Sequence, residues 1–598
     1  MRKLPALILL AITIHYFPAP VFGDMEPFFS PAEKKGSITV KLYPMENVKP
    51  GASTLVTFGM PFTRGSVTEI SLANIRVLND NKTEIPTYVD QLTPWRHIFN
   101  TAVDSKSVRF ARIQFLYTFS VLYPNHETVT VEWGVNRRTK TRRGILNPGT
   151  AWHLVESGSF VAGDSVYEPD VYAVLPKEYL CQGIIKPTRM LPLDQGVPET
   201  REDPEIFNVS SWKPGYGLMD HAQHNNFFTI INEDDPRVVP KNLCPYKTQF
   251  EPWLYDRSSS IYILYFRSGH LKELREAVRN TMFYKNNLYD DSTKPFQFSG
   301  LFKIKTPEIK GTPTGNNAMY SYNECLAYTY WLTCNDDVRN AVKWVVNAHD
   351  QNDEPTRWNP KLPVWTERHT AFHLLAHTVA YEITGETAYR DSIVSMYNTF
   401  IWHQNGADGN SLPRQRVDGG LWHYGFQHED GDPDSVVASS WMTAITVDAM
   451  LRVYAVSEDR KIADFIRRVG SFEKAACKRD ENHNYGDGPI WFCDYMVRYN
   501  GLSEVRTSGD MIDHSMEIGT TAAWAAYFSY QLGMSDPSLV ELTDRLFDSY
   551  TLCVKHWITP DGPLHGNSAF RVSPWRKYGW EYRPSGSFTW ILANLKGK

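Results

Sequence analysis

Three histidines stand on a four-residue pitch in residues 366–385, TERHTAFHLLAHTVAYEITG. The apolar residues around them follow helical spacing, which predicts His369, His373 and His377 along one helix. Histidines at positions i and i+4 of a helix can bind zinc together. The metalloprotease form of this motif needs an intervening glutamate, and here threonine, alanine and phenylalanine stand between the first two histidines. The spacing therefore leaves three interpretations open: a metal site, an active-site wall, or core packing.

A metal on this helix would need a third ligand from another segment, and His428 or Asp430 could supply it. We favour an interpretation without a metal. His369, in the first turn of the helix, is then the functional residue. His373 and His377 lie deeper among apolar residues, where they pack or orient His369, because buried polar groups need partners. We expect no required cofactor, although a structural divalent metal is compatible with the sequence.

Other groups able to transfer protons or bind anions occur in three further stretches. They are residues 319–332 (MYSYNECLAYTYWL), the glycine-containing loop 414–435 (RQRVDGGLWHYGFQHEDGDPDS) and residues 220–228 (DHAQHNNFF). Loops concentrate functional residues, which favours the second stretch. The candidates for proton transfer are His369, His423, and Tyr424 or Tyr322. The candidates for substrate binding are Arg368, Asn323, Arg416, His224, Asn225, Trp422 and His428. Each has a structural alternative, as a cap, a core residue or a member of a polar pair.

The elements that position these residues fall into two classes. Strand-like alternation marks five stretches, at residues 37–45, 53–62, 70–79, 108–119 and 128–135. They predict an N-terminal antiparallel β-domain over residues 24–135, a sandwich or a barrel. Residues 136–215 are irregular and rich in proline, glycine and charge, and we interpret them as a connector.

From residue 216 the pattern is helical and repeats to residue 598. Short polar turns that begin at Ser268, Thr333, Thr384, Ser457 and Gly533 each follow an apolar helix and offer caps to a second, amphipathic one. Repeated helical hairpins predict an (α/α)6-type toroid. Its inner helices would run parallel, so their polar first turns would meet on one face. Helix N-termini carry partial positive charge, so this face would suit an anion even in an acidic protein.

Composition bounds the class of protein. The 598 residues carry a net charge of −5, and the sequence lacks the basic field of a nucleic-acid-binding protein. Residues 1–23 have a basic start and a short apolar core, which predicts a signal peptide cleaved near Gly23 and a secreted protein. No later stretch is apolar for long enough to span a membrane. The seven cysteines are too few for a disulfide scaffold, and Cys477 with Cys493 is the best candidate pair. The sequence does not indicate the oligomeric state.

Several motifs resemble a known family. VTFGMPFTRGSV at 56–67, with the SLANIRVLNDNKTEIPTYVDQLTPW that follows, resembles the N-terminal barrel domain of exo-acting rhamnogalacturonan lyases and their relatives. YSYNECLAYTYWLT and TERHTAFHLLAH resemble inner helices of the toroid that follows in that group, which includes ulvan lyases. The resemblance covers most of the chain beyond residue 23. It implies a lyase acting on an anionic polysaccharide of rhamnose and uronic acid, without assigning catalytic positions.

A polysaccharide lyase cleaves by β-elimination at C4 of a uronic acid. One group must neutralise the carboxylate, a base must take the C5 proton, and an acid must protonate the leaving oxygen. The candidate histidines, tyrosines, arginines and asparagine suit these tasks. A glycoside hydrolase on the same toroid would instead use two carboxylates, for which the candidates are Glu324, Glu367, Asp434 and Glu517. A non-catalytic glycan-binding protein would use some of the 18 tryptophans and 32 tyrosines as stacking platforms.

Overall fold

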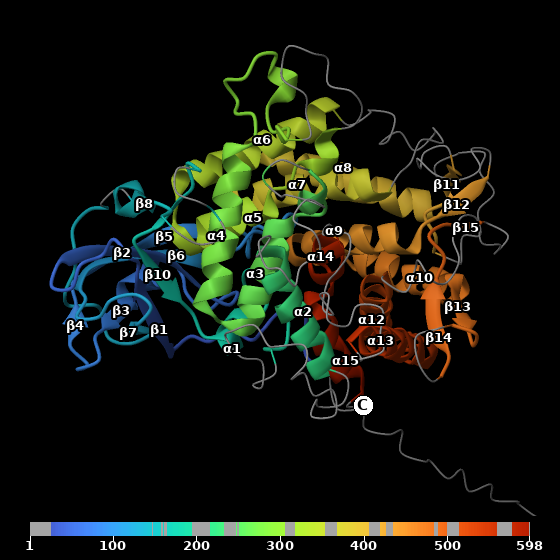
Figure 1. Cartoon of the computed structure of the whole chain (residues 1–598), viewed down its shortest axis with the longest axis horizontal. Coiled ribbons are helices and arrows are strands. Elements are labelled where there is room, and N and C mark those ends of the chain that lie inside the picture. Colours follow the sequence, from blue (N-terminus) through green and yellow to red (C-terminus); the bar gives the residue numbers. More distant parts are fainter. Residues whose placement is uncertain are drawn as a thin grey trace, which may run out of the picture.

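The computed structural model places a β-rich part beside a larger helical part (Figure 1). It describes residues 25–145, 148–156, 160, 164–193, 216–231, 247, 250–304, 317–352, 367–405, 419–425, 435–483, 488–498, 514–558 and 577–596. The predicted signal peptide lies outside these residues, as do Arg416, His428, Asp430 and Asp434.

Two antiparallel sheets make up the N-terminal part. One has the strand order β10-β1-β7-β3-β4 and the other β2-β6-β5. Their bounds are β1 Gly36–Pro44, β2 Ser53–Pro61, β3 Arg76–Leu78, β4 Glu84–Ile85, β5 Thr87–Pro94, β6 Val108–Thr118, β7 Glu127–Trp133 and β10 Val171–Val174. Four of the five predicted strands are confirmed within two residues at each end, because their alternating apolar residues fill the core between the sheets.

Two stretches differ from the expected strand pattern. Residues 70–79 were expected to form one strand. Instead, Ile70–Asn74 form a 3-10 helix, and the strand β3 begins only at Arg76. Thr68 and Ser71 exchange side-chain and main-chain hydrogen bonds there, which offers the backbone an alternative to strand pairing. The range interpreted as a connector contributes β10, which pairs antiparallel with β1. It also forms β8 Trp152–Leu154, β9 Tyr167–Pro169 and α1 Lys177–Leu180.

Five antiparallel helical pairs dominate the rest of the described chain, and the five predicted turns are confirmed. The pairs are α3 Arg257–Ser268 with α4 Leu271–Asn286, α5 Glu324–Thr333 with α6 Asp336–Asn352, α7 Glu367–Thr384 with α8 Thr387–Asn405, α9 Ser440–Ser457 with α10 Arg460–Ala476, and α12 Ser515–Gln531 with α13 Pro537–Ile558. The caps act as expected at Asp459, whose side chain accepts a hydrogen bond from the amide of Lys461.

The first helices of these pairs form a ring. α3, α5, α7, α9 and α12 pack in sequence, and α14 Lys577–Tyr582 contacts both α12 and α3, which closes the circle. α15 Phe588–Lys596 packs on α12, and α2 Tyr216–Ile231 contacts α13, α14 and α3. The ring helices are buried almost throughout, whereas α6 and α10 alternate buried and exposed residues. This is the arrangement predicted for an (α/α) toroid.

The β-rich part packs against the C-terminal ends of ring helices. Phe110 of β6 stacks on Trp331 near the end of α5, with ring centroids 5.0 Å apart. Gly59 lies so close to the carbonyl of Trp331 that a Cβ atom would be 1.6 Å from its oxygen. Because the C-terminal ends face the sheets, the N-terminal ends of the same helices lie at the opposite end of the ring.

A buried network of charged side chains crosses the ring, between the C-terminal and the N-terminal ends of the ring helices. It is made up of Arg109, Glu382, Arg452, Glu324, Arg583, Asp448 and Lys186. Arg452 joins Glu382 of α7, 2.6 Å away, to Glu324 of α5, 2.5 Å away. Each charge has an oppositely charged neighbour, which a buried ion requires.

Short strands extend the helical part, and one pair carries a disulfide. They are β11 His423–Tyr424, β12 Val436–Ala438, β13 Cys477–Asp480, β14 Ile490–Cys493 and β15 Val497–Arg498. Cys477 and Cys493 stand opposite each other on β13 and β14 and form the predicted bridge. Among the helices of the described ranges, none has the length and apolar character that crossing a membrane requires.

Candidate functional site

The N-terminal ends of α7, α9 and α12 meet, together with α14, in one cluster of polar and aromatic side chains. The main-chain amide of Ser439, which caps α9, donates to Oε1 of Glu367 at the start of α7, 3.3 Å away. Trp441, in the first turn of α9, stacks on His514 just before α12, with centroids 4.8 Å apart. Trp580 of α14 lies 4.8 Å from the same histidine ring. The polar openings of these ring helices therefore converge as the sequence predicted.

Glu367 and His423 form the first histidine–carboxyl pair of the cluster. The His423 Nδ1 atom lies 3.7 Å from Oε1 of Glu367, and both side chains are fully buried. The same nitrogen lies 3.0 Å from the carbonyl oxygen of Leu421, which accepts a hydrogen bond from it. That bond places a proton on Nδ1, so the neutral imidazole carries its lone pair on Nε2. Pairing of β11 with β12, with His423 opposite Val437, fixes the main chain at this position.

The Glu367 carboxyl is held in its neutral form. Burial raises the pKa of Glu367 to about 8, against the opposing effects of the Ser439 amide and the Arg368 cation. Its second oxygen, Oε2, has no hydrogen-bond partner among the described residues. At neutral pH this side chain is therefore mostly a carboxylic acid, able to donate a proton or a hydrogen bond.

His514 and Glu517 form a second pair, one helical turn apart at the start of α12. His514 Nδ1 and Glu517 Oε1 are 3.0 Å apart. The imidazole contacts the rings of Trp441 and Trp580, and Tyr255 contacts both of those tryptophans edge-on. A carboxylate on one nitrogen and aromatic rings around the imidazole are features that orient a histidine for proton transfer.

The remaining predicted residues of α7 and the β11 region are neighbours of the first pair in the chain. His369 is buried and stands two residues after Glu367, with the half-buried Arg368 between them. Tyr424 is half-buried and stands opposite Val436 in the β11–β12 pairing. Trp422 is buried against Phe472 of α10, with ring centroids 5.7 Å apart. The structure thus brings His423 close to Glu367, with Arg368 and His369 following Glu367 in the chain, and the functional roles of these residues remain predictions.

Tyr322 and Asn323 are engaged with main-chain groups. The Tyr322 hydroxyl accepts a hydrogen bond from the Tyr255 amide, 2.8 Å away, and donates to the Met319 carbonyl, 2.5 Å away. Burial raises the pKa of Tyr322 well above its ordinary value. The Asn323 amide donates to the carbonyl of Ala376 in α7, 2.9 Å away. These bonds connect α5 to its neighbours, and the predicted catalytic and binding roles of the two residues stay untested.

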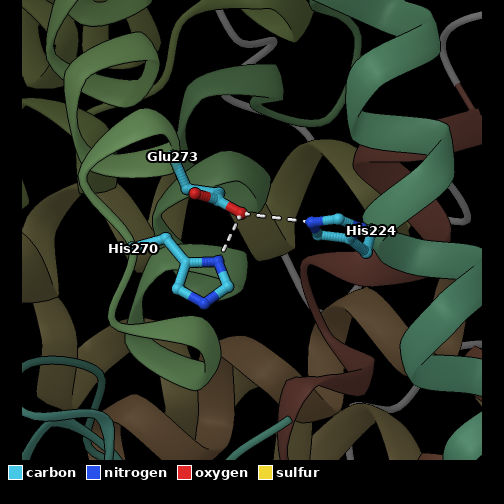
Figure 2. A group of neighbouring side chains, drawn as sticks. All are labelled: His224, His270 and Glu273. Atoms are coloured by element: carbon cyan, nitrogen blue, oxygen red, sulfur yellow. Dashed lines mark hydrogen bonds and ion pairs between the residues drawn. The ribbon is translucent and has the colours of Figure 1, made fainter. Parts of the chain in front are cut away.

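His224 belongs to a different group, which Figure 2 shows. Its Nε2 atom lies 3.7 Å from Oε1 of Glu273 on α4, and His270 Nδ1 lies 3.3 Å from the same oxygen. His224 is a residue of α2 whose side chain faces α4, and it is not at the start of α7, α9 or α12. The side chain of Asn225 lies outside the described part of the structure, as do Arg416 and His428.

Sequence reasoning missed several residues of the cluster. Trp441 and Trp580 were not among the candidates, although the polar-to-apolar change at SSWMTAI marks the start of a ring helix. His514 and Glu517 belong to a predicted polar helix opening, but Glu517 was a candidate only for a hydrolase and His514 was not a candidate for proton transfer. Glu367 was a candidate for a hydrolase alone, because nothing local to it indicates a raised pKa.

No family model and no curated protein matches this chain. Among solved structures, it is similar to cellobiose 2-epimerase from Bacillus thermoamylovorans B4167, with 12% identity and a TM-score of 0.36 over 55% of this chain and 85% of that chain. It is also similar to a sugar epimerase from a ruminal bacterium, with 14% identity and a TM-score of 0.36 over 57% and 87% of the two chains. It is similar as well to unsaturated glucuronyl hydrolase from Streptococcus agalactiae, with 12% identity and a TM-score of 0.35 over 68% of this chain and 98% of that chain. Likeness at this level assigns no activity to the chain.

Proposed function

We propose that the protein is a secreted polysaccharide lyase that cleaves a rhamnose- and uronate-containing polymer, such as ulvan or rhamnogalacturonan, by β-elimination. The observation that carries the proposal is the contact between His423 and the neutral carboxyl of Glu367, with Arg368 adjacent in the chain. A lyase needs a base together with a group that removes the negative charge of the substrate carboxylate. A neutral acid and a cation beside an oriented imidazole supply both.

The roles follow from the chemistry of each group. Arg368 and the protonated Glu367 would bind the uronate carboxylate, which makes the C5 proton more acidic and stabilises the developing enolate. His423, with its Nε2 lone pair, would take the C5 proton. As the C4–O bond breaks and the C4=C5 double bond forms, the leaving oxygen takes a proton from a nearby acid, for which His369 and Tyr424 remain the candidates. Trp580, half-buried beside His514, would offer an apolar face on which a sugar ring stacks.

The contacts of Tyr322 argue against a role for its hydroxyl in proton transfer. Its hydroxyl already has a main-chain donor and a main-chain acceptor. Leaving either one unpaired in a buried site costs about 1–3 kcal/mol. We therefore assign proton transfer to His423 with His369 or Tyr424, and a positioning role to Tyr322.

One observation favours a glycoside hydrolase as a second candidate. Glu367 and Glu517 are both buried, and each has one carboxyl oxygen without a hydrogen-bond partner among the described residues. A neutral Glu367 could serve as general acid and Glu517 as base or nucleophile. This alternative uses the same cluster and differs in the product.

The test is incubation of the purified protein with ulvan, rhamnogalacturonan and other polyuronides. A lyase generates ultraviolet absorbance from the unsaturated uronate, and His423→Gln should reduce that rate about 10²–10⁴-fold. His126→Gln, an exposed position in the β-rich part, is the matched control and should keep the wild-type rate. New reducing ends without the absorbance would select the hydrolase. Saccharide binding without either product would select a glycan-binding protein.

A further inference from the structure

His373 and His377 converge on a carboxylate that the sequence did not suggest. Their Nε2 atoms each lie 2.9 Å from the same oxygen, Oδ1 of Asp350, which stands near the end of α6. The two nitrogens and the carboxylate oxygen all lie within 4.8 Å of one another. The histidines are one turn apart on α7, so a single helix fixes both.

We propose that Asp350, His373 and His377 form a binding site for one divalent transition-metal ion of the zinc type. Two imidazole nitrogens and one carboxylate oxygen match the ligands that zinc and its neighbours in the transition series prefer. Calcium and magnesium prefer sites made of oxygens alone. The proposal does not depend on the lyase function.

The spacing of the ligand atoms fits a cation between them. A metal about 2.1 Å from each atom would see the oxygen and either nitrogen at an angle of roughly 90°. That is the angle between neighbouring positions in five- and six-coordinate complexes, and a small outward shift of Asp350 would give a tetrahedral angle. Three protein ligands leave at least one position for water or another ligand.

The site has an entrance and a rigid wall. Asp350 is 43% exposed at its side chain and lines a cavity of about 670 Å³ that is bordered by α6, residues 291–299 and one residue of α8. Tyr389 of α8 lines the same cavity and contacts the His377 ring edge-on. His349 stacks on His373, with ring centroids 5.4 Å apart, and hydrogen-bonds to the Ser321 carbonyl. The cavity gives an ion access, while the surrounding rings hold the imidazoles in place.

The surroundings also set the expected strength of binding. His377 Nδ1 has no hydrogen-bond partner among the described residues. A ligating histidine usually donates from its second nitrogen, and loss of such a partner costs about 10–100-fold in affinity. We therefore expect binding in the micromolar range rather than the nanomolar range. An ion here would tie the end of α6 to His373 and His377 of α7, about 9 and 15 Å along that helix from Glu367.

The test uses the full-length protein after treatment with a chelator, titrated with zinc chloride by calorimetry. The wild type should bind one zinc per chain at this site, and Asp350→Asn and His377→Gln should each weaken that binding about 100-fold or more. Asp291→Asn is the matched control, because Asp291 lines the same cavity but is not one of the three ligands, and it should bind as the wild type does. Calcium chloride should produce no comparable heat.

A second readout guards against a folding defect in the variants. Cobalt(II) bound by two histidines and a carboxylate gives visible absorption bands, which should appear in the wild type and in Asp291→Asn and be absent from Asp350→Asn. Circular dichroism of the metal-free variants should match that of the metal-free wild type. Weak binding that does not saturate in the wild type, or equal affinity in the wild type, Asp350→Asn and His377→Gln, would overturn the proposal.

Discussion

Replacing Glu367 by glutamine should make the protein more stable at alkaline pH. Burial raises the pKa of Glu367 from 4.5 to about 8. Between these pH values the folded protein holds a proton that the unfolded chain releases, so the free energy of unfolding falls as pH rises through the window. At about 1.4 kcal/mol per pH unit, the whole fall is about 5 kcal/mol. Glutamine keeps the shape and the acceptor for the Ser439 amide but has no proton to lose.

The assay is urea unfolding of wild type and Glu367→Gln from pH 4.5 to 9, with reversibility checked by refolding. The difference in free energy of unfolding should grow by about 3–5 kcal/mol in favour of the variant as pH rises to 8, and then level off. Glu473, whose pKa is also raised to about 8 by burial, contributes equally to both proteins and cancels. A difference that stays flat across this range would refute the neutral carboxyl at position 367.

Glu324→Gln is the matched control, and we expect it to lower the free energy of unfolding, where Glu367→Gln raises it. Glu324 is the first residue of α5, as Glu367 is of α7, and both are buried. Although burial favours its neutral form, Arg583, Lys186 and Arg452 hold the pKa of Glu324 well below its ordinary value. Removing its charge leaves two buried arginines short of a partner, so this variant should lose about 3–5 kcal/mol at neutral pH.

Three further outcomes are expected. If the protonated Glu367 acts in catalysis, the wild-type rate should fall as pH rises through about 8, which a pH profile of initial rates measures. Trp580→Ala should weaken saccharide binding about 2–10-fold while the far-ultraviolet circular dichroism is unchanged, since one aromatic contact contributes about 0.5–1.5 kcal/mol; an unchanged affinity would remove Trp580 from the site. Cys477→Ser should lower the free energy of unfolding by about 3 kcal/mol, because the bridge to Cys493 closes a loop across a sequence separation of 16; an equal denaturation midpoint under oxidising conditions would contradict this.

The elements that the sequence predicts well are those set by local chemistry. The helical turns follow from caps such as Asp459, which act on amides two residues away. The Cys477–Cys493 bridge follows from two cysteines that flank one short loop. Where local hydrogen bonds compete with the apolar pattern, as at Ser71, the predicted strand gives way to a 3-10 helix.

The chemistry of the site depends on distant partners, which spacing does not reveal. Glu324 and Glu367 look equivalent in the sequence, and their opposite charge states come from Arg452 and Arg583, which lie 128 and 259 residues from Glu324. In the same way, the histidine pitch predicted that His373 and His377 follow one helix but not that Asp350 would meet them. Long-range contacts of this kind decide which polar residues are structural and which are available for chemistry.

The most direct test of the proposed function is the ultraviolet absorbance of an unsaturated uronate during incubation with polyuronides. We expect the absorbance to rise with ulvan or rhamnogalacturonan for the wild type, and to rise far more slowly for His423→Gln. No rise with any polyuronide, or an undiminished rise in His423→Gln, would contradict the assignment of β-elimination to this cluster.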